Sequence, residues 1–215
     1  MKLTIRQIFK DPKAFADQEV VLQGWIRNHR DQKEFGFINL NDGSFFETIQ
    51  VVYEREKTAD FEAVTRLTVG SSIEVVGILE LTPERSQPFE IKAKSVKLLG
   101  GADETYPIQP KRHTREFLRE VAHLRPRTNL FSAVFRVRSL TAFAIHKFFQ
   151  ERDFVYVNTP LITANDGEGA GEMFKVTTLN LDKLPRTELG EIDFSKDFFG
   201  KAANLTVTGQ LEGEA

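Results

Sequence analysis

Alternating apolar and polar residues are the first pattern in the chain, and they fill residues 18–99. Within residues 18–27, the apolar side chains of Val20, Leu22 and Ile26 share one parity. Four further short apolar runs follow, at residues 35–40, 47–53, 72–79 and 89–99. A period of two residues predicts β-strands with one face turned toward a core.

Two local signals connect these strands. Residues 41–44 contain an Asp-Gly pair between two apolar runs, which predicts a β-hairpin. Residues 59–67 place Phe61, Val64 and Leu67 three positions apart, which predicts a helix. Three strands, a helix and two strands are the element order of the OB-fold, a five-stranded barrel that binds oligonucleotides. Another small β-barrel is the alternative.

The pattern changes after the Gly-Gly pair at residues 100–101. Residues 102–110 contain two prolines and predict an extended linker. We expect a long helix over residues 128–153 and a strand at 154–157. The β-branched run at residues 205–207 predicts another strand, followed by a polar turn at Gly209 and Gln210.

The predicted long helix is apolar on more than one face. One stripe contains Val134, Val137, Thr141, Ala144, Ile145 and Phe148. Outside this stripe lie Leu130, Phe131, Phe135 and Phe149. A helix of this kind is expected to be buried on more than one side, at the centre of its domain or at a subunit interface.

Composition and charge narrow the class of protein. The chain has 215 residues, of which 40% are hydrophobic and 28% charged, so we expect a globular protein. Its formal net charge is −2, so any contact with nucleic acid must come from a local patch. Residues 111–138 form a basic stretch across the expected domain junction, with eight Lys or Arg and two Glu. The start of the chain has no apolar leader and no apolar run is long enough to span a bilayer, which predicts a cytoplasmic protein without a membrane segment.

Metal and thiol chemistry have no support in the sequence. The absence of cysteine excludes disulfides, thiolate metal sites and cysteine nucleophiles. The four histidines lack the spacing of metal ligands. Asp166, Glu168 and Glu172 are interpreted as solvated loop acids, so we expect no metal site in the chain.

Strand parity predicts which side chains face solvent. A barrel interior takes the apolar set of one parity, namely Ile38, Leu40, Ile49, Val51, Tyr53, Phe89, Ile91 and Ala93. Phe37, Gln50 and Glu90 are then left on the outer surface of three strands. Stacking of a base on an exposed Phe contributes about 1–3 kcal/mol. Gln offers a donor and an acceptor to a base edge, and Glu accepts from an exocyclic amine. Arg27 and Arg30 are expected to supply phosphate or base contacts nearby.

This face predicts a surface that binds unpaired bases. In the alternative, Phe37 packs against another domain and Gln50 is an ordinary surface residue.

The same residues resemble a known family. Three segments, at residues 24–31, 37–40 and 49–52, are similar to the anticodon-binding OB domain of class II aminoacyl-tRNA synthetases of the aspartate, asparagine and lysine subgroup. Residues 148–163 resemble motif 1 of that class, with Pro160 as its proline. The resemblance implies three regions, an OB-fold domain at 1–100, a hinge at 101–127 and, at 128–215, the start of an α+β catalytic domain with an antiparallel sheet.

Within the subgroup, residues 167–174 and 198–214 are similar to asparaginyl-tRNA synthetases. The aspartate enzymes carry a Lys three residues after the Gln that matches Gln210, and this chain has Gly213 there. A substrate carboxylate would lose its counter-ion, whereas a neutral amide loses nothing. The alternatives are an aspartyl or dual-specificity relative, and an OB-fold module that binds RNA without catalysis.

The resemblance also implies roles for particular residues. Four match anticodon-contacting positions of the family, Arg30, Phe37, Gln50 and Glu90. Glu168 matches a residue that binds the substrate α-ammonium, a suitable partner for a carboxylate, and Gln210 matches another amino-acid contact. For Glu168 the alternative is a loop carboxylate that caps a turn. The glycines around it do not fit a phosphate-binding loop, because they lack the G-x-G-x-x-G spacing.

The implied activity is ATP-dependent activation of L-asparagine and its transfer to tRNA(Asn) by a homodimer, with Mg²⁺ bound alongside ATP. The family's two ATP-binding arginine motifs fall beyond Ala215. Activation stabilises charge on phosphate mainly through cations and positioning. We therefore expect no catalytic residue within this chain and no asparaginyl-adenylate formation by these 215 residues alone.

Overall fold

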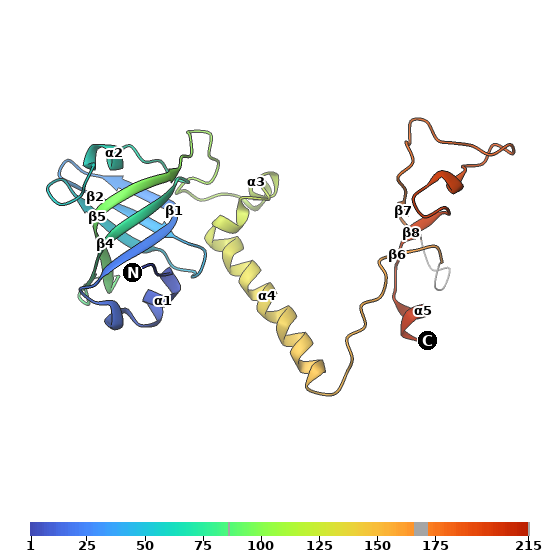
Figure 1. The fold of residues 1–215 in the computed structure, drawn as a ribbon, viewed down its shortest axis with the longest axis horizontal. Coiled ribbons are helices and arrows are strands. Elements are labelled where there is room, and N and C mark those ends of the chain that lie inside the picture. Colours follow the sequence, from blue (N-terminus) through green and yellow to red (C-terminus); the bar gives the residue numbers. More distant parts are fainter. Residues whose placement is uncertain (86, 166–171, 215) are drawn as a thin grey trace. The chain divides into compact units, whose positions relative to one another are not determined.

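The computed structural model describes residues 1–85, 87–165 and 172–214 (Figure 1). Its internal contacts divide the chain into two compact units, Met1–Thr141 and Ala142–Ala215. Each unit is described by itself below.

A closed five-stranded barrel dominates the first unit. Its strands are β1 (Glu19–Asp31), β2 (Phe35–Asn41), β3 (Ile49–Glu54), β4 (Ser72–Leu81) and β5 (Phe89–Gly100), arranged in the order β1-β2-β3-β5-β4. All neighbouring strands are antiparallel except β3 and β5, which pair in parallel. Helix α2 (Phe61–Thr65) connects β3 to β4. The OB-fold prediction is therefore confirmed.

Strand parity places the predicted residues in the barrel core. The inward set listed above lies at most 4% exposed. Tyr53 is the polar member: its hydroxyl donates to Asp31 Oδ1 at 2.9 Å and lies 2.6 Å from His29 Nε2. Desolvation raises the pKa of Tyr53, and the hydrogen bond to Asp31 raises it further. A Cβ on Gly36 would collide with the Tyr53 ring, so the glycine makes room for this buried aromatic.

Helix α1 (Ile5–Lys10) closes one end of the barrel, and α2 lies at the other end (Figure 1). Thr4 and Gln7 form a capping box at the start of α1, and Ile5 and Ile8 of this helix are fully buried in the core. The predicted β2–β3 hairpin adds a second cap, because Asp42 Oδ2 accepts from the Ile5 amide at 2.8 Å. A hairpin loop thus ties the first helix to the barrel.

The segment between the barrel and the long helix packs on the barrel. Residues 102–110 form no helix or strand, as expected. The Ala102 amide nevertheless donates to Ser71 Oγ at 3.1 Å, and Arg127 Nη1 donates to the Tyr106 hydroxyl at 3.2 Å. Helix α3 (Arg115–Glu120) and a 3₁₀ turn, η2 (Arg125–Arg127), follow. Ile108 and Leu118 are buried, so the predicted hinge carries a small apolar contact of its own.

Helix α4 (Asn129–Gln150) is the predicted long helix. None of its residues is buried in the described structure, and Leu140 and Phe143 are 69% and 67% exposed. Burial at the centre of a domain is therefore not seen among the described residues, whereas burial at a subunit interface stays a prediction. Most of the apolar faces are exposed, and residues 154–157 contact the end of the helix at His146 and Phe149.

The second unit contains a small antiparallel sheet. Strands β6 (Ile162–Thr163), β8 (Ala203–Leu205) and β7 (Lys175–Val176) lie in that order. A 3₁₀ turn, η3 (Phe194–Lys196), precedes Asp197, whose carboxylate accepts from Thr177, Thr178 and the Phe198 amide. These hydrogen bonds, the one from the Thr177 hydroxyl above all, lower the pKa of Asp197 to about 2.

Two strand predictions in this unit are wrong. Residues 154–157 form no strand, because their described neighbour is the end of α4 and no described strand pairs with their backbone. The strand expected at residues 205–207 ends at Leu205. Thr206 then uses its hydroxyl in a local contact with the Thr208 carbonyl, which favours a bend over a strand. Gln210 begins a short helix, α5 (Gln210–Gly213), where a turn was expected.

Candidate nucleic-acid interface

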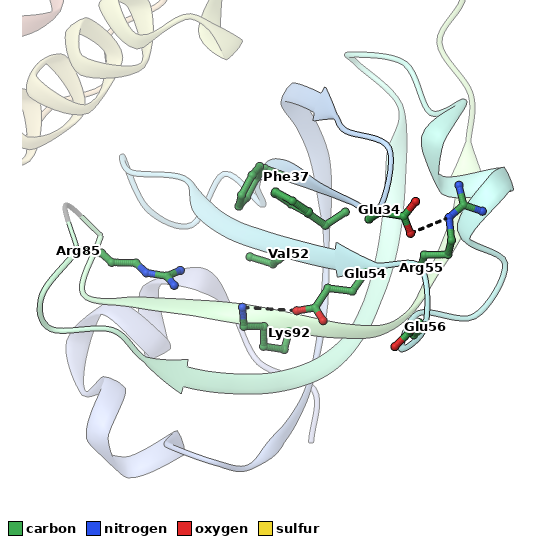
Figure 2. Close-up of a pocket in the computed structure, with 9 residues that line it drawn as sticks. Glu34, Phe37, Val52, Glu54, Arg55, Glu56, Arg85 and Lys92 are labelled. Atoms are coloured by element: carbon green, nitrogen blue, oxygen red, sulfur yellow. Dashed lines mark ion pairs between the residues drawn. The ribbon is translucent and has the colours of Figure 1, made fainter.

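The outer face of β2, β3 and β5 carries a pocket of about 480 Å³ (Figure 2). Phe37 and Val52 form its apolar floor, and charged side chains surround them. Lys92 stands on β5, and Arg85 reaches toward the pocket from the β4–β5 loop. Three cations and three glutamates form the charged rim, so its charges balance (Arg55, Arg85, Lys92, Glu34, Glu54 and Glu56). An apolar floor with such a rim suits a flat ligand that has polar edges.

Phe37 faces outward, as strand parity predicted. Its ring meets Phe35 edge-on, with centroids 5.5 Å apart. Arg30 lies opposite Phe37 in the β1–β2 register, and its guanidinium carbon is 5.6 Å from the ring centroid. The ring is partly exposed, and a neighbouring cation adds an attraction for any π-system or phosphate that approaches. The geometry therefore brings the predicted Arg30 and Phe37 together.

Glu90 lies on the outer side of β5, but it is not exposed. Only 1% of its side chain is accessible, because three neighbours cover the carboxylate. Arg85 Nη1 lies 2.8 and 2.9 Å from its two oxygens, Lys92 Nζ lies 2.8 Å from Oε1, and Gln50 Nε2 lies 3.0 Å from Oε2. The prediction of an exposed carboxylate is therefore corrected.

The charge of Glu90 follows from these contacts. Desolvation by burial raises the pKa of Glu90, but the hydrogen bonds from Lys92 and Gln50 and the nearby cations outweigh it. The net pKa lies below its ordinary value, so the group is an ionised acceptor at neutral pH. A carboxylate offers about four lone-pair sites. Its contacts with Arg85, Lys92 and Gln50 use all of them.

Gln50 takes its orientation from this carboxylate. A carboxylate accepts but cannot donate, so the Gln50 amide turns its Nε2 toward Glu90. Oε1 has no hydrogen-bond donor among the described side chains. The backbone amide of Gln50 donates to Gln87 Oε1 at 2.9 Å, which ties the β4–β5 loop to β3. Gln50 therefore presents an oriented acceptor beside Phe37.

Sequence reasoning assigned no role to two cations of this site. Strand parity places Lys92 on the same outward face as Glu90, but it does not indicate the ion pair between them. Arg85 lies in a loop, where no periodicity indicates direction. Its side chain is 58% exposed although it contacts a buried carboxylate.

The remaining predicted residues lie in the second unit. Gln210 is the first residue of α5, and its Nε2 donates to Glu214 Oε1 at 2.8 Å. Pro160 is exposed in the irregular segment before β6. Glu168 lies outside the described residues, as do the glycines of its loop. The structure therefore joins the four barrel residues as two pairs, Arg30 with Phe37 and Gln50 with Glu90, and of the four only Phe37 lines the pocket. No contact between Gln210 and another predicted amino-acid-binding residue is described.

Two general properties complete the description. Within residues 1–85, 87–165 and 172–214, no group of three His, Cys, Asp or Glu side chains could hold a metal ion. None of the described helices combines the length and apolar character that a bilayer span requires.

Two protein families match the chain, one for each part. The OB-fold nucleic acid binding domain matches residues 20–99, which contain the five barrel strands except for the first residue of β1 and the last of β5. The class II tRNA synthetases of the D, K and N group match residues 114–199. Residues 100–113 lie between the two matches.

Curated relatives match along the whole chain. The asparagine–tRNA ligase of Acholeplasma laidlawii is 78% identical over 215 residues, which are 100% of this chain and 46% of the relative. That of Alkaliphilus oremlandii is 58% identical over 213 residues, covering 99% of this chain and 46% of the relative. The chain thus spans about half the length of the curated relatives it matches.

Solved structures share the fold. Asparaginyl-tRNA synthetase from Pyrococcus horikoshii, complexed with asparaginyl-adenylate, has a TM-score of 0.77 at 21% identity, over 99% of this chain and 44% of that one. A putative aspartyl-tRNA synthetase from Leishmania major has a TM-score of 0.74 at 16% identity, over 99% and 39%. At these identities the likeness concerns the fold alone. The chain thus contains a match to the OB-fold nucleic acid binding domain and a match to the class II tRNA synthetases of the D, K and N group, and it is similar along its whole length to part of curated asparagine–tRNA ligases.

Proposed function

We propose that the chain is part of an asparagine–tRNA ligase and that its barrel binds the anticodon loop of tRNA(Asn). The observation that carries this proposal is the outer barrel face. Phe37 lies beside Arg30 there, and Gln50, held by Glu90, stands two residues along β3 from Val52, which is opposite Phe37. The match of this barrel to a nucleic-acid-binding domain and the names of the curated relatives support it.

Each residue of the face has a physical role in this proposal. Phe37 stacks a loop base, and Arg30 stabilises that base or its phosphate from the same side. Gln50 Oε1 accepts from a base N–H, because its Nε2 is held by Glu90. Glu90 belongs to the site chiefly by orienting Gln50. A base could bond to its carboxylate directly only if Arg85, Lys92 or Gln50 gave up a contact.

The catalytic part of the proposal concerns the whole protein. It activates asparagine with ATP and transfers it to tRNA, with Glu168 and Gln210 contacting the amino acid. ATP and Mg²⁺ are the expected co-reactants. The described residues contain no carboxylate cluster that fits Mg²⁺, so we assign neither of them a site here.

Asparagine is favoured over aspartate by Gly213. A Cβ on this glycine would meet no described atom within 4 Å, so lack of space does not explain the missing side chain. A Lys there would supply a cation for aspartate, and its absence suits a neutral amide. Both curated relatives described above are asparagine–tRNA ligases.

The domain boundaries at residues 100 and 127 are part of the proposal. So is a homodimer formed through α4 and the segment that contains Pro160, and so is a cytoplasmic location.

Binding of a tRNA(Asn) anticodon stem-loop to the 215-residue chain tests the RNA-binding proposal. Phe37→Ala should weaken binding by about 1–3 kcal/mol, because it removes the stacking platform. Phe199→Ala, which removes a partly exposed Phe from the second unit, is the matched control and should leave binding unchanged. Equal affinities of the wild type and Phe37→Ala would exclude Phe37 from the site.

Specificity is tested in the whole protein by ATP–pyrophosphate exchange. We expect exchange that depends on asparagine and not on aspartate. Exchange with aspartate alone would favour the aspartyl alternative, and exchange with neither would favour a binding module without catalysis.

A further inference from the structure

A second hollow of the first unit lies between the barrel and the segment that follows it. It has a volume of about 770 Å³. One wall comes from β1, β2 and the β2–β3 hairpin, and the other from residues 108–113, α3 and the start of α4. We call it the linker groove. Its linker wall lies mostly within residues 100–113, which neither matched family covers.

Cations without carboxylate partners line this groove. Arg27 projects from β1, and Lys111 and Arg112 come from the linker. None of the three appears in an ion pair among the described residues. In the Phe37 pocket, by contrast, Arg85 and Lys92 both pair with Glu90. The groove therefore has positive charge that the described chain does not neutralise.

The surroundings of Arg27 also indicate that its positive charge is not neutralised by the described residues. Desolvation by burial lowers the pKa of Arg27, the nearby Tyr106 acts against it, and the charge of Arg127 lowers the pKa further. Its contact among the described side chains is a long one, 3.5 Å from Nη2 to Asn129 Oδ1. A partly desolvated guanidinium with a single weak acceptor is stabilised by an anion.

The linker groove adjoins the Phe37 face. Asn39 stands two residues after Phe37 on β2 with the same outward parity, so the two are about 7 Å apart along the strand. Asn39 is opposite Gln50 in the β2–β3 register and opposite Asn28 in the β1–β2 register. Asn28 and Asn39 both line the groove. A polymer bound at Phe37 and Gln50 can therefore continue across the two asparagines toward the linker cations.

We propose that the linker groove binds the sugar–phosphate backbone of the RNA strand that leaves the Phe37–Gln50 face. Arg27, Lys111 and Arg112 pair with phosphates, while Asn28, Asn39 and Gln109 bond to phosphate or 2′-hydroxyl oxygens. This inference rests on the proposed function of the barrel. Unpaired cations interspersed with amides suit a backbone better than an apolar peptide, and they predict contacts that do not depend on sequence.

The salt dependence of binding tests this groove in the 215-residue chain. The probes are an RNA hairpin that contains the anticodon stem and loop, and a short single strand that contains only the loop. For Lys111→Ala/Arg112→Ala, the loss of hairpin affinity between about 50 and 200 mM salt should become roughly 10-fold smaller, because two phosphate contacts are gone. Binding of the short strand should be unchanged.

Two variants isolate the effect of the groove. Lys10→Ala/Lys13→Ala removes the same charge from exposed positions outside the groove and should leave the salt dependence unchanged. Lys111→Arg/Arg112→Lys keeps the charge and should behave as the wild type, which separates charge from folding. An unchanged salt dependence in the double alanine variant would overturn the proposal. Failure of the short strand to respond to Phe37→Ala would instead count against the proposed barrel function.

Discussion

Gln50 Nε2 donates to Glu90 Oε2 at 3.0 Å, from β3 to the neighbouring β5. Because the carboxylate only accepts, this bond leaves the Gln50 oxygen as the group presented to a base. Glu90→Gln removes that constraint, since a glutamine at position 90 can either donate or accept. We expect a loss of about 0.5–1.5 kcal/mol in discrimination at the base that Gln50 reads, which is the net value of one hydrogen bond.

Calorimetric titration with the anticodon stem-loop and a version changed at one loop base measures this difference. Glu54→Gln is the matched control, because Glu54 contacts Lys92 and Lys57 but has no hydrogen bond to Gln50. Full discrimination by Glu90→Gln would show that Gln50 is oriented by something else.

The same carboxylate predicts how stability depends on pH. The pKa of Glu90 in the folded protein lies below its ordinary value of 4.5. Its contribution to the free energy of unfolding is therefore fully present above pH 4.5, and it is lost as the pH falls through the lower, folded value. We expect the stability difference between wild type and Glu90→Gln to be largest near neutral pH and to shrink in acid.

Urea unfolding of the wild type and of Glu90→Gln, at a series of pH values from neutral to strongly acidic, measures this stability difference. A difference that grows in acid would mean that the ionised form is not the one the fold stabilises.

Strand parity predicted the barrel and its outward face because both depend on local alternation. The inward and outward positions of Ile38, Phe37 and Gln50 follow from it directly. The burial of Glu90 could not be predicted in this way, since it depends on Arg85, a loop residue whose direction has no periodic signal. Parity specifies the side of a strand, whereas exposure also depends on which neighbouring side chains cover it.

In the second unit, local sequence signals predicted strands that the structure does not contain. Residues 154–157 have strong β-propensity, but propensity alone does not form a strand without a neighbour for its backbone groups. Thr206 and Val207 are also β-branched, yet the strand ends before them at Leu205. The described residues supply few partners here, so local signals were least reliable in this unit.

Tyr53 provides a test of the barrel core. Tyr53→Phe keeps the ring inside the barrel but removes the hydroxyl that joins Asp31 and His29. Both partners then lose a hydrogen bond in a partly buried place, which costs about 1–3 kcal/mol. Urea denaturation of the 215-residue chain should show this loss without a change in the dependence on denaturant. Unchanged stability would mean that water replaces the hydroxyl at no cost.

Helix α4 carries the last prediction. Its apolar side chains are exposed in the described structure, and Leu140 and Phe143 are among the most exposed. Apolar surface of this extent favours association. If α4 takes part in the proposed homodimer, the 215-residue chain should self-associate with a concentration dependence that sedimentation velocity can measure. Phe143→Glu should shift the equilibrium toward monomer, because it places a charge on the apolar face. Arg138→Gln, at an exposed position on another face of the same helix, changes the net charge by the same amount as Phe143→Glu and is the control. A monomer at all concentrations, for the wild type and both variants, would contradict association through α4.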